Sequence, residues 1–179
     1  MKKFCISFFI LAIIILSAIG LNLEENNVKK EYLRIHVRAH SNLEEDQAIK
    51  YLVKDAVVEY LTPFIAECDT KEKAERMLKG KLFEIERVAD QVLKLNGKDY
   101  KSKASVREEE FPTRVYGSLC LENGFYDALI LNLGSGEGNN WWCVVYPPLC
   151  FTGEGSSYVY KSKIKEIIDG FFYRQEKKQ

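Results

Sequence analysis

The alternation of apolar and polar positions over residues 32–39 is the first regular pattern in the part of the chain that can fold. Positions 33, 35, 37 and 39 are apolar, whereas Arg34 and Arg38 occupy polar positions between them. A period of two is typical of a β-strand with one buried face. The sequence therefore predicts a strand here, with its two arginines facing away from the core.

A helix is predicted directly after this strand. Apolar residues from Ile49 to Phe64 recur at the spacing i, i+3, i+4, i+7, which is typical of an amphipathic helix. Ser41 and Asn42 are each followed three residues later by a glutamate, and either pair makes a capping box. Pro63 is expected to end or kink this helix.

A second helix is predicted from a similar pattern further along. Asp69 and Glu72 form its expected cap, and an apolar stripe runs over residues 74–92. Asn96-Gly97 is a good C-terminal stop. We expect the two helices to form a hairpin that lies across a sheet.

The rest of the chain predicts further strands and a closing helix. Residues 100–110 form a polar strand, and residues 125–133 and 141–146 are expected to pair as a hairpin around the glycine-rich loop 134–140. Residues 164–172 indicate a short C-terminal helix. The predicted class is α+β, with the helices packed on one face of a mostly antiparallel sheet, in a single domain over residues 32–175.

Composition and charge exclude several classes of protein. The chain has 179 residues, of which 46% are hydrophobic and 29% charged, so it is long and apolar enough for one folded domain. Its 26 basic and 26 acidic residues balance, without the basic excess typical of proteins that bind nucleic acid. Without its first twenty residues the chain has a net charge of −2, from 24 basic and 26 acidic residues.

The first twenty residues resemble a targeting segment. Lys2 and Lys3 precede an apolar stretch over residues 4–16, and Ser17–Gly20 supply small residues for cleavage, as in a secretory signal peptide. The alternative is an uncleaved membrane anchor, since residues 4–21 are just long enough to span a membrane. Both readings export the rest of the chain. Residues 21–31 are predicted to be a polar tether.

Four cysteines follow this segment, and an oxidising compartment permits them to pair. Cys143 and Cys150 flank a Pro-Pro turn that can bring them together, and closing that loop stabilises the fold by about 2.5 kcal/mol. Cys68 and Cys120 are a second candidate pair. Buried free thiols are the alternative for all four.

The two histidines and the glycine-rich loop are weak candidates for chemistry. His36 and His40 would lie about 13 Å apart on a continued strand, too far for one metal ion to bridge. A catalytic cysteine paired with one of these histidines stays open. The glycines of the 134–138 segment precede a strand and lack a following lysine, so a loop with positive φ is expected there instead of a phosphate site. No cofactor or metal ion is expected.

Trp141 and Trp142 are the most informative pair, because neighbouring residues of a strand face opposite sides. One tryptophan can fill the core below the helices, and the other must face away. An exposed aromatic cluster would mark a partner surface, although burial of both by loops or the closing helix stays open. The candidate partner-binding residues are Trp141, Trp142, Tyr146, Leu149 and Phe151, with Arg34 and Arg38 as a polar rim.

Residues 140–151, with the sequence NWWCVVYPPLCF, resemble the signature of the stage II sporulation protein R family. Further segments of the chain resemble the same family. They are LRIHV at 33–37, AHSN at 39–42, DQ at 46–47, VKDAV at 53–57, FPT at 111–113, YG at 116–117 and YDAL at 126–129.

This resemblance implies a function that periodicity does not. Members of the family are made in the forespore and secreted across the cytoplasmic membrane into the space between forespore and mother cell. There they trigger a membrane-embedded aspartic protease, from its extracytoplasmic side, to process pro-sigma-E. The chain is then expected to be an activator and not an enzyme, with membrane contact only through an uncleaved N-terminal segment. An exported cysteine-dependent hydrolase and a passive wall or coat component are the alternatives.

Overall fold

The structure is a computed structural model, and it describes nearly all of the chain after residue 30. The described residues are Ile10, Leu11, Ile13, Ile15, Lys29, 31–117, 119–151 and 158–177, without the side chains of 158–161. The chain divides into two compact units, residues 1–31 and 32–179, of which the second is described below. The predicted targeting segment and tether lie mostly outside the described residues and stay predictions. None of the described helices has the length and apolar content needed to cross a membrane.

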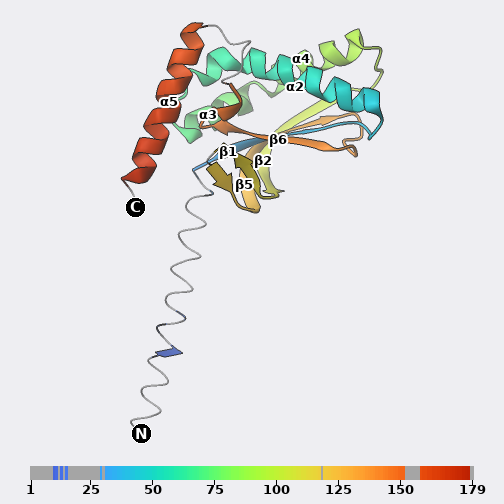
Figure 1. Cartoon of the computed structure of the whole chain (residues 1–179). Coiled ribbons are helices and arrows are strands. Elements are labelled where there is room, and N and C mark those ends of the chain that lie inside the picture. Colours follow the sequence, from blue (N-terminus) through green and yellow to red (C-terminus); the bar gives the residue numbers. More distant parts are fainter. Residues whose placement is uncertain are drawn as a thin grey trace. The chain divides into compact units, whose positions relative to one another are not determined.

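A four-stranded mixed sheet is the centre of the second unit (Figure 1). Its strands are β1 (Leu33–Arg38), β2 (Ser102–Phe111), β5 (Gly124–Leu133) and β6 (Asn140–Tyr146), in the spatial order β2-β5-β1-β6. β1 runs parallel to β5 and antiparallel to β6, and β2 runs antiparallel to β5. Two of the three pairings are antiparallel, so the predicted α+β class with a mostly antiparallel sheet is confirmed.

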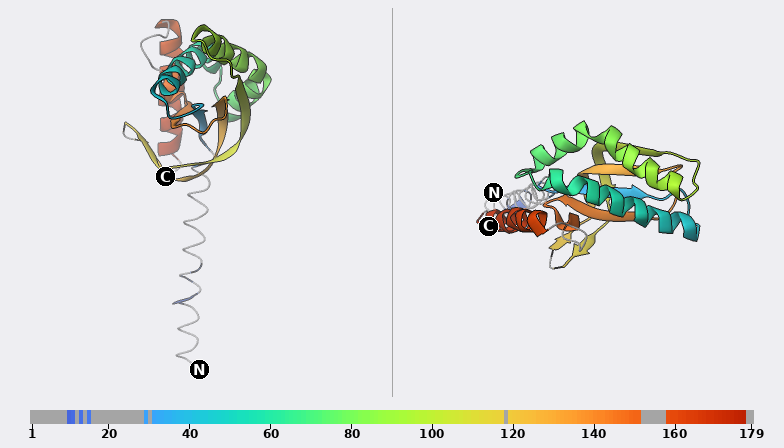
Figure 2. Two further views of the ribbon diagram at one scale, coloured as in Figure 1. Left: turned by 90° about the vertical axis from the view of Figure 1, so that its right-hand side faces the viewer. Right: turned by 90° about the horizontal axis from the view of Figure 1, so that it is seen from above.

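Three helices cover one face of this sheet, as Figures 1 and 2 show. They are α2 (Glu44–Ile65), α3 (Lys71–Gly80) and α4 (Leu82–Leu95). The apolar positions predicted for the first strand and for the helical stripes meet in the core, where they are almost fully buried. They include Leu33, Ile35, Val37, Val53, Val57, Leu61, Leu78, Ile85 and Leu93.

The expected hairpin between β5 and β6 is wrong, because β1 lies between these two strands. The loop of residues 134–139 therefore crosses the end of β1 and spans two strand spacings, about 10 Å, which six residues reach easily. Periodicity identifies a strand but not its neighbours. β1 takes the central place because both of its faces are buried, including that of Arg34 and His36, which are at most 1% exposed.

The crossing loop is held against the segment that follows β1. The N–H of Gly138 donates to the carbonyl oxygen of Ala39 at 2.9 Å, and the N–H of Asn139 donates to the side chain of Asn42 at 2.7 Å. The approach is so close that a Cβ atom on Gly138 would lie 2.2 Å from the carbonyl oxygen of Ser41. This position therefore requires glycine.

The start of α2 differs from the predicted capping box. Ser41 accepts a hydrogen bond from the N–H of Leu43 at 3.1 Å and donates one to Asp46 at 2.6 Å. The reciprocal partner of Ser41 is thus Asp46, which is buried, and not a glutamate of the first turn. The helix continues past Pro63 to Ile65, so the proline lies within its last turn.

The second predicted helix is divided into α3 and α4 at Lys81. Gly80 precedes this break and has a low helix propensity, and Lys81 leaves the helical region with φ −119°. The N-cap of α3 is Thr70, whose side chain accepts from the N–H of Lys73, instead of Asp69. The predicted stop after α4 is confirmed, since Gly97 has φ +72°.

A two-stranded ribbon and a C-terminal helix complete the fold. β3 (Arg114–Tyr116) and β4 (Leu119–Leu121) pair as a short ribbon on the side of the sheet away from α2 and α4 (Figure 1). The C-terminal helix α5 (Tyr158–Glu176) is longer than expected, with 19 residues. Its Phe171 packs against Tyr32 at a ring-centroid distance of 5.3 Å.

The close approach at Gly138 predicts a large effect of one methyl group. Gly138→Ala should lower the free energy of unfolding by about 2 kcal/mol or more, because the backbone of the crossing loop must move away from Ser41. Gly80→Ala is the matched control, since a Cβ there meets nothing within 4 Å, and it should be neutral or slightly stabilising. Urea unfolding measures both variants, and equal effects would contradict the role of Gly138.

Candidate functional site

The two tryptophans face opposite sides of β6, as predicted. Trp141 lies on the helix side, where the ammonium group of Lys54 from α2 is 5.5 Å from its ring centroid. Trp142 lies on the opposite face, where it pairs with His36 of β1. Both side chains are partly buried, so neither of them is a bare surface residue. We call the side of the sheet that carries Arg34, His36 and Trp142 the helix-free face.

An aromatic cluster occupies the helix-free face. The rings of His36 and Trp142 are stacked, with centroids 3.6 Å apart and an angle of 23° between their planes. Phe111, the last residue of β2, meets Trp142 edge-on at 4.8 Å and His36 at 5.8 Å. Such offset and edge-on contacts are favourable arrangements for aromatic rings. The cluster fixes His36 and Trp142 in one orientation.

Arg34 lies next to this cluster and is fully buried. Its guanidinium carbon is 4.1 Å from the ring centroid of Phe111 and 4.8 Å from that of Tyr126. Its Nη2 donates to the hydroxyl of Tyr116 in β3 at 3.0 Å. The Nε and Nη1 atoms have no hydrogen-bond partner among the described residues. The charge of Arg34 is thus held mainly by aromatic faces instead of a carboxylate.

Glu109 of β2 is the carboxylate that reaches this cluster from within the sheet. It forms an ion pair with Arg38, and its Oε2 lies 3.8 Å from both Arg107 Nη2 and His36 Nδ1. This oxygen has no hydrogen-bond partner among the described residues. One carboxylate thus serves two arginines and a histidine.

Burial determines the charge state of His36. It lowers the pKa of this histidine from 6.5 to about 4, and the positive charges of Arg38, Arg34 and Arg107 act in the same direction. His36 is therefore neutral near pH 7. Burial also lowers the pKa of Arg34, although an arginine stays charged at this pH.

The structure contradicts part of the predicted partner surface. Tyr146 and Phe151 are at most 3% exposed and belong to the core, and Arg34 is not a rim residue. Leu149 is half-buried in the short 3₁₀ helix η1 (Leu149–Phe151). Tyr146 is buried because β6 has an irregularity beside Leu33, which turns its side chain toward the helices, where its hydroxyl donates to the carbonyl oxygen of Asp69 at 2.6 Å.

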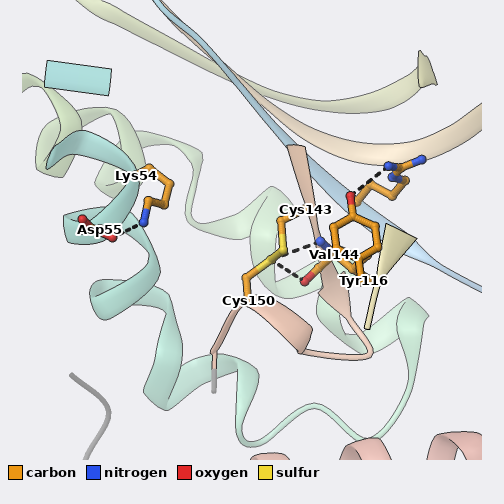
Figure 3. The surroundings of a disulfide bond; sticks show 7 residues. Lys54, Asp55, Tyr116, Cys143, Val144 and Cys150 are labelled. Carbon is orange, nitrogen blue, oxygen red and sulfur yellow. Dashed lines mark hydrogen bonds and ion pairs between the residues drawn. A yellow bond between two sulfur atoms is a disulfide. The ribbon is translucent and has the colours of Figure 1, made fainter. Parts of the chain in front are cut away.

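The predicted disulfide between Cys143 and Cys150 is present, with 6.2 Å between the two Cα atoms (Figure 3). The N–H of Val144 donates to Cys150 Sγ at 3.1 Å, and the carbonyl oxygen of Val144 lies 3.0 Å from the same sulfur. Cys150 therefore covers the outer edge of β6 at Val144. This arrangement ties the segment after the Pro-Pro turn back to the sheet.

Cys68 and Cys120 are not paired with one another. Cys68 is buried, and burial raises the pKa of its thiol. Cys120 is exposed on β4, and loss of solvation together with the charge of Glu122 raises the pKa of its thiol as well. Both shifts disfavour the thiolate, which is the reactive form of cysteine. The proposed pairing of these two residues is wrong.

The two histidines have separate structural contacts. His40 stacks on Tyr100 with a centroid distance of 4.3 Å, and its Nδ1 accepts a hydrogen bond from the N–H of Ser135 in the crossing loop at 3.0 Å. Gly134 and Gly136 in this loop have positive φ angles, as predicted. Within the described residues, no group of three or more histidine, cysteine, aspartate or glutamate side chains could hold a metal ion.

Comparison with known proteins gives the family. The sequence profile described as Stage II sporulation protein R matches residues 29–156. The chain belongs to the stage II sporulation protein R family. The protein of that name from Bacillus subtilis (strain 168) is 31% identical over 159 residues, which cover 84% of this chain and 71% of that protein. No solved structure matches the chain. The resemblance inferred from the sequence is confirmed.

The family-like segments have two structural roles. Residues of the first kind hold the crossing loop. The side chain of Asn42 accepts from the N–H of Asn139 at 2.7 Å, and Gln47 accepts at 2.8 Å from the buried ammonium group of Lys50, which also donates to the carbonyl oxygen of Asn139 at 3.1 Å. Residues of the second kind, Phe111 and Tyr116 among them, surround Arg34. The sequence interpretation did not select Arg107, Glu109 or Phe111 as site residues. Phe111 alone had a signal, because it begins one of the family-like segments.

The neutral state of His36 predicts a specific dependence of stability on pH. The unfolded chain takes up a proton at His36 below about pH 6.5, whereas the folded protein does so only below about pH 4. The free energy of unfolding should therefore fall as the pH drops through this window, by about 3 kcal/mol at most.

His36→Phe tests this prediction, because a phenylalanine ring can keep the stack on Trp142 without a titrating group. The difference in unfolding free energy between wild type and variant should change in this pH window, as measured by urea titration. Parallel stability curves from pH 7 to pH 4 would contradict the assignment.

The disulfide predicts a second effect on stability. Because Cys143 and Cys150 close a short loop, adding a reductant should lower the free energy of unfolding of the wild type by about 2.5 kcal/mol. The double variant Cys143→Ala/Cys150→Ala should be destabilised similarly and show no further response to reductant. A response of the double variant equal to that of the wild type would refute the assignment.

Proposed function

We propose that this protein is an exported signal of endospore formation, which activates the membrane-embedded aspartic protease that processes pro-sigma-E in the mother cell. Membership of the stage II sporulation protein R family, over most of the chain, is the observation that carries this proposal. The protein would act from the space between forespore and mother cell, on the extracytoplasmic side of the protease.

Two features support export. The first twenty residues have the order of charged, apolar and small residues that is typical of a signal peptide. The disulfide between Cys143 and Cys150 suits an oxidising compartment, because such bonds persist outside the reducing cytoplasm. The first twenty residues would direct export, and the folded domain after them would carry the signal.

The chemistry of the cysteines supports an activator more than a hydrolase. Two of the four exported cysteines are bonded to one another, and the thiols of Cys68 and Cys120 have raised pKa values. A cysteine nucleophile needs a lowered pKa or an adjacent base. The description of the family is that of a sporulation protein, and it names no enzymatic activity.

Reconstitution tests the proposal. The protease is placed in the membrane of vesicles, with its extracytoplasmic side outward and pro-sigma-E enclosed inside. The purified chain from residue 21 onward is added outside. We expect cleavage of pro-sigma-E only when both proteins are present, because activation requires the signal on the extracytoplasmic side. Immunoblotting of the cleaved product measures the outcome.

Variants separate the alternatives. Cys120→Ser and Cys68→Ser should activate as the wild type does, whereas a cysteine-dependent hydrolase would lose its activity in one of them. In sporulating cells, deletion of the gene should abolish expression from a reporter that depends on the mother-cell sigma factor. An unchanged reporter would refute the signalling role and would leave an exported hydrolase or a wall or coat component.

A further inference from the structure

The helix-free face concentrates the arginines of the protein. Four of the seven arginines in the sequence lie there, and the structure describes all seven. They are Arg34 and Arg38 from β1, Arg107 from β2 and Arg114 from β3. The other three lie on helices α3, α4 and α5. This distribution is unexpected in a domain whose net charge is weakly negative.

The strand register places Arg34 and Arg107 on the same face of the sheet, two strands apart. Arg34 and Arg107 are both aligned with Ala128 of β5, one from each side, so their side chains leave the same face. Arg114 reaches this face from the β3–β4 ribbon, where its guanidinium carbon is 6.0 Å from the ring centroid of Trp142. Trp142 therefore stacks on His36 and has Arg114 nearby, and it stays partly exposed.

The positive charge of this face is not balanced within the described residues. Glu109 is shared between Arg38 and Arg107, and its Oε2 has no hydrogen-bond partner among them. Two guanidinium nitrogens of Arg34, Nε and Nη1, also have no hydrogen-bond partner among the described residues. This side chain is fully buried. The pKa of Arg34 is lowered by burial and further by the charge of Arg114. Like charges gathered in this way cost stability, which is typical of surfaces kept for binding.

The exposed part of the face can contact a partner directly. The side chains of Arg38 and Arg107 are 26% and 55% exposed, and Arg114 is exposed as well. Trp142 lies between these groups with part of its ring accessible. A planar guanidinium fork fits a carboxylate by two parallel hydrogen bonds.

We propose that the helix-free face is the surface by which this protein docks an acidic segment of its protein partner. Arg38, Arg107 and Arg114 would pair with carboxylates of that segment, and Trp142 would receive an apolar side chain between them. The identity of the partner rests on the proposed function, whereas the chemistry of the surface does not.

A protein partner fits this face better than a lipid surface does. Arginine and tryptophan are enriched at the centres of protein interfaces, where a fixed geometry selects the ligand. The stack of His36 on Trp142 and the edge-on contact of Phe111 hold Trp142 in place. Capture by anionic lipid needs only positive charge near the surface, for which an aromatic cluster beside the arginines is unnecessary.

The first experiment measures the surface without the protease. The probe is a short fluorescent peptide of alternating glutamate and serine, and its control has glutamine in place of glutamate. Fluorescence anisotropy measures binding. We expect the acidic peptide to bind, and more weakly at high salt, whereas the control peptide should not bind. The Trp141→Phe variant leaves Trp142 as the one tryptophan, and its emission should shift when the peptide binds.

Paired variants make the result specific to the face. Arg107→Gln/Arg114→Gln should weaken binding by about tenfold or more. Arg76→Gln/Arg87→Gln removes the same charge from exposed positions on α3 and α4 and should leave binding unchanged. Arg107→Lys/Arg114→Lys keeps the charge but loses the planar guanidinium group, so we expect intermediate binding. This lysine variant replaces the glutamine variant in the test if the glutamine variant does not fold.

The same variants are then tested on the protease in vesicles of neutral lipid. Loss of protease binding by Arg107→Gln/Arg114→Gln, with the control pair active, supports the inference. If the wild type binds the acidic peptide but not the protease, the proposed function fails while the surface stands. If both variant pairs bind the protease equally, the surface assignment is overturned while the proposed function stands.

Three further outcomes overturn the inference. One is that the acidic and the control peptide bind equally or not at all. A second is that vesicles of anionic lipid compete with the peptide, which would make the face a lipid site. The third is that the wild type dimerises through these arginines in sedimentation experiments, which would make the partner a second copy of this chain.

Discussion

The central position of β1, buried on both faces, is the constraint on which the rest of the structure depends. Its apolar residues Leu33, Ile35 and Val37 require a helix layer on one side, which α2, α3 and α4 supply. Its other side carries Arg34 and His36, which can be buried only if aromatic rings and Glu109 surround them. β5 and β6 flank this strand, so the loop between them must cross its end, and Gly138 permits the close approach.

Burial of a cation and an imidazole at this place is costly, and the chain offsets the cost only in part. An unpaired ion inside a protein loses several kcal/mol of solvation, and an aromatic face returns about 2 kcal/mol for a desolvated contact. Among the described residues, Arg34 contacts three aromatic rings and one hydroxyl but has no carboxylate of its own. His36 avoids the cost of a buried charge by staying neutral, although both of its ring nitrogens have no hydrogen-bond partner among the described residues. A stable core of this size would not need either residue, which favours a functional reason for both.

Local patterns in the sequence predicted the elements well, because helices and strands are fixed by the periodicity of neighbouring residues. The opposite orientations of Trp141 and Trp142 followed from the same rule. The orientation of Tyr146 was not predicted by this rule. Alternation along β6 puts Tyr146 on the face of Trp142, whereas the irregularity beside Leu33 turns it to the helix side. The order of the strands and the placement of Arg107 on the same face as Arg34 depend on contacts between distant segments, which periodicity does not contain.

Each edge of the sheet is covered at particular residues, and this bears on where a partner can bind. At β2, the carboxylates of Asp90 and Glu86 accept from the N–H groups of Ser102 and Ala104, at 2.7 and 2.8 Å. At β6, Cys150 covers Val144 through the disulfide. Strand pairing with another chain is thus hindered at these points, as in sheets protected against aggregation. One face of the sheet is taken by helices, so the arginine-rich opposite face is where side-chain recognition can take place.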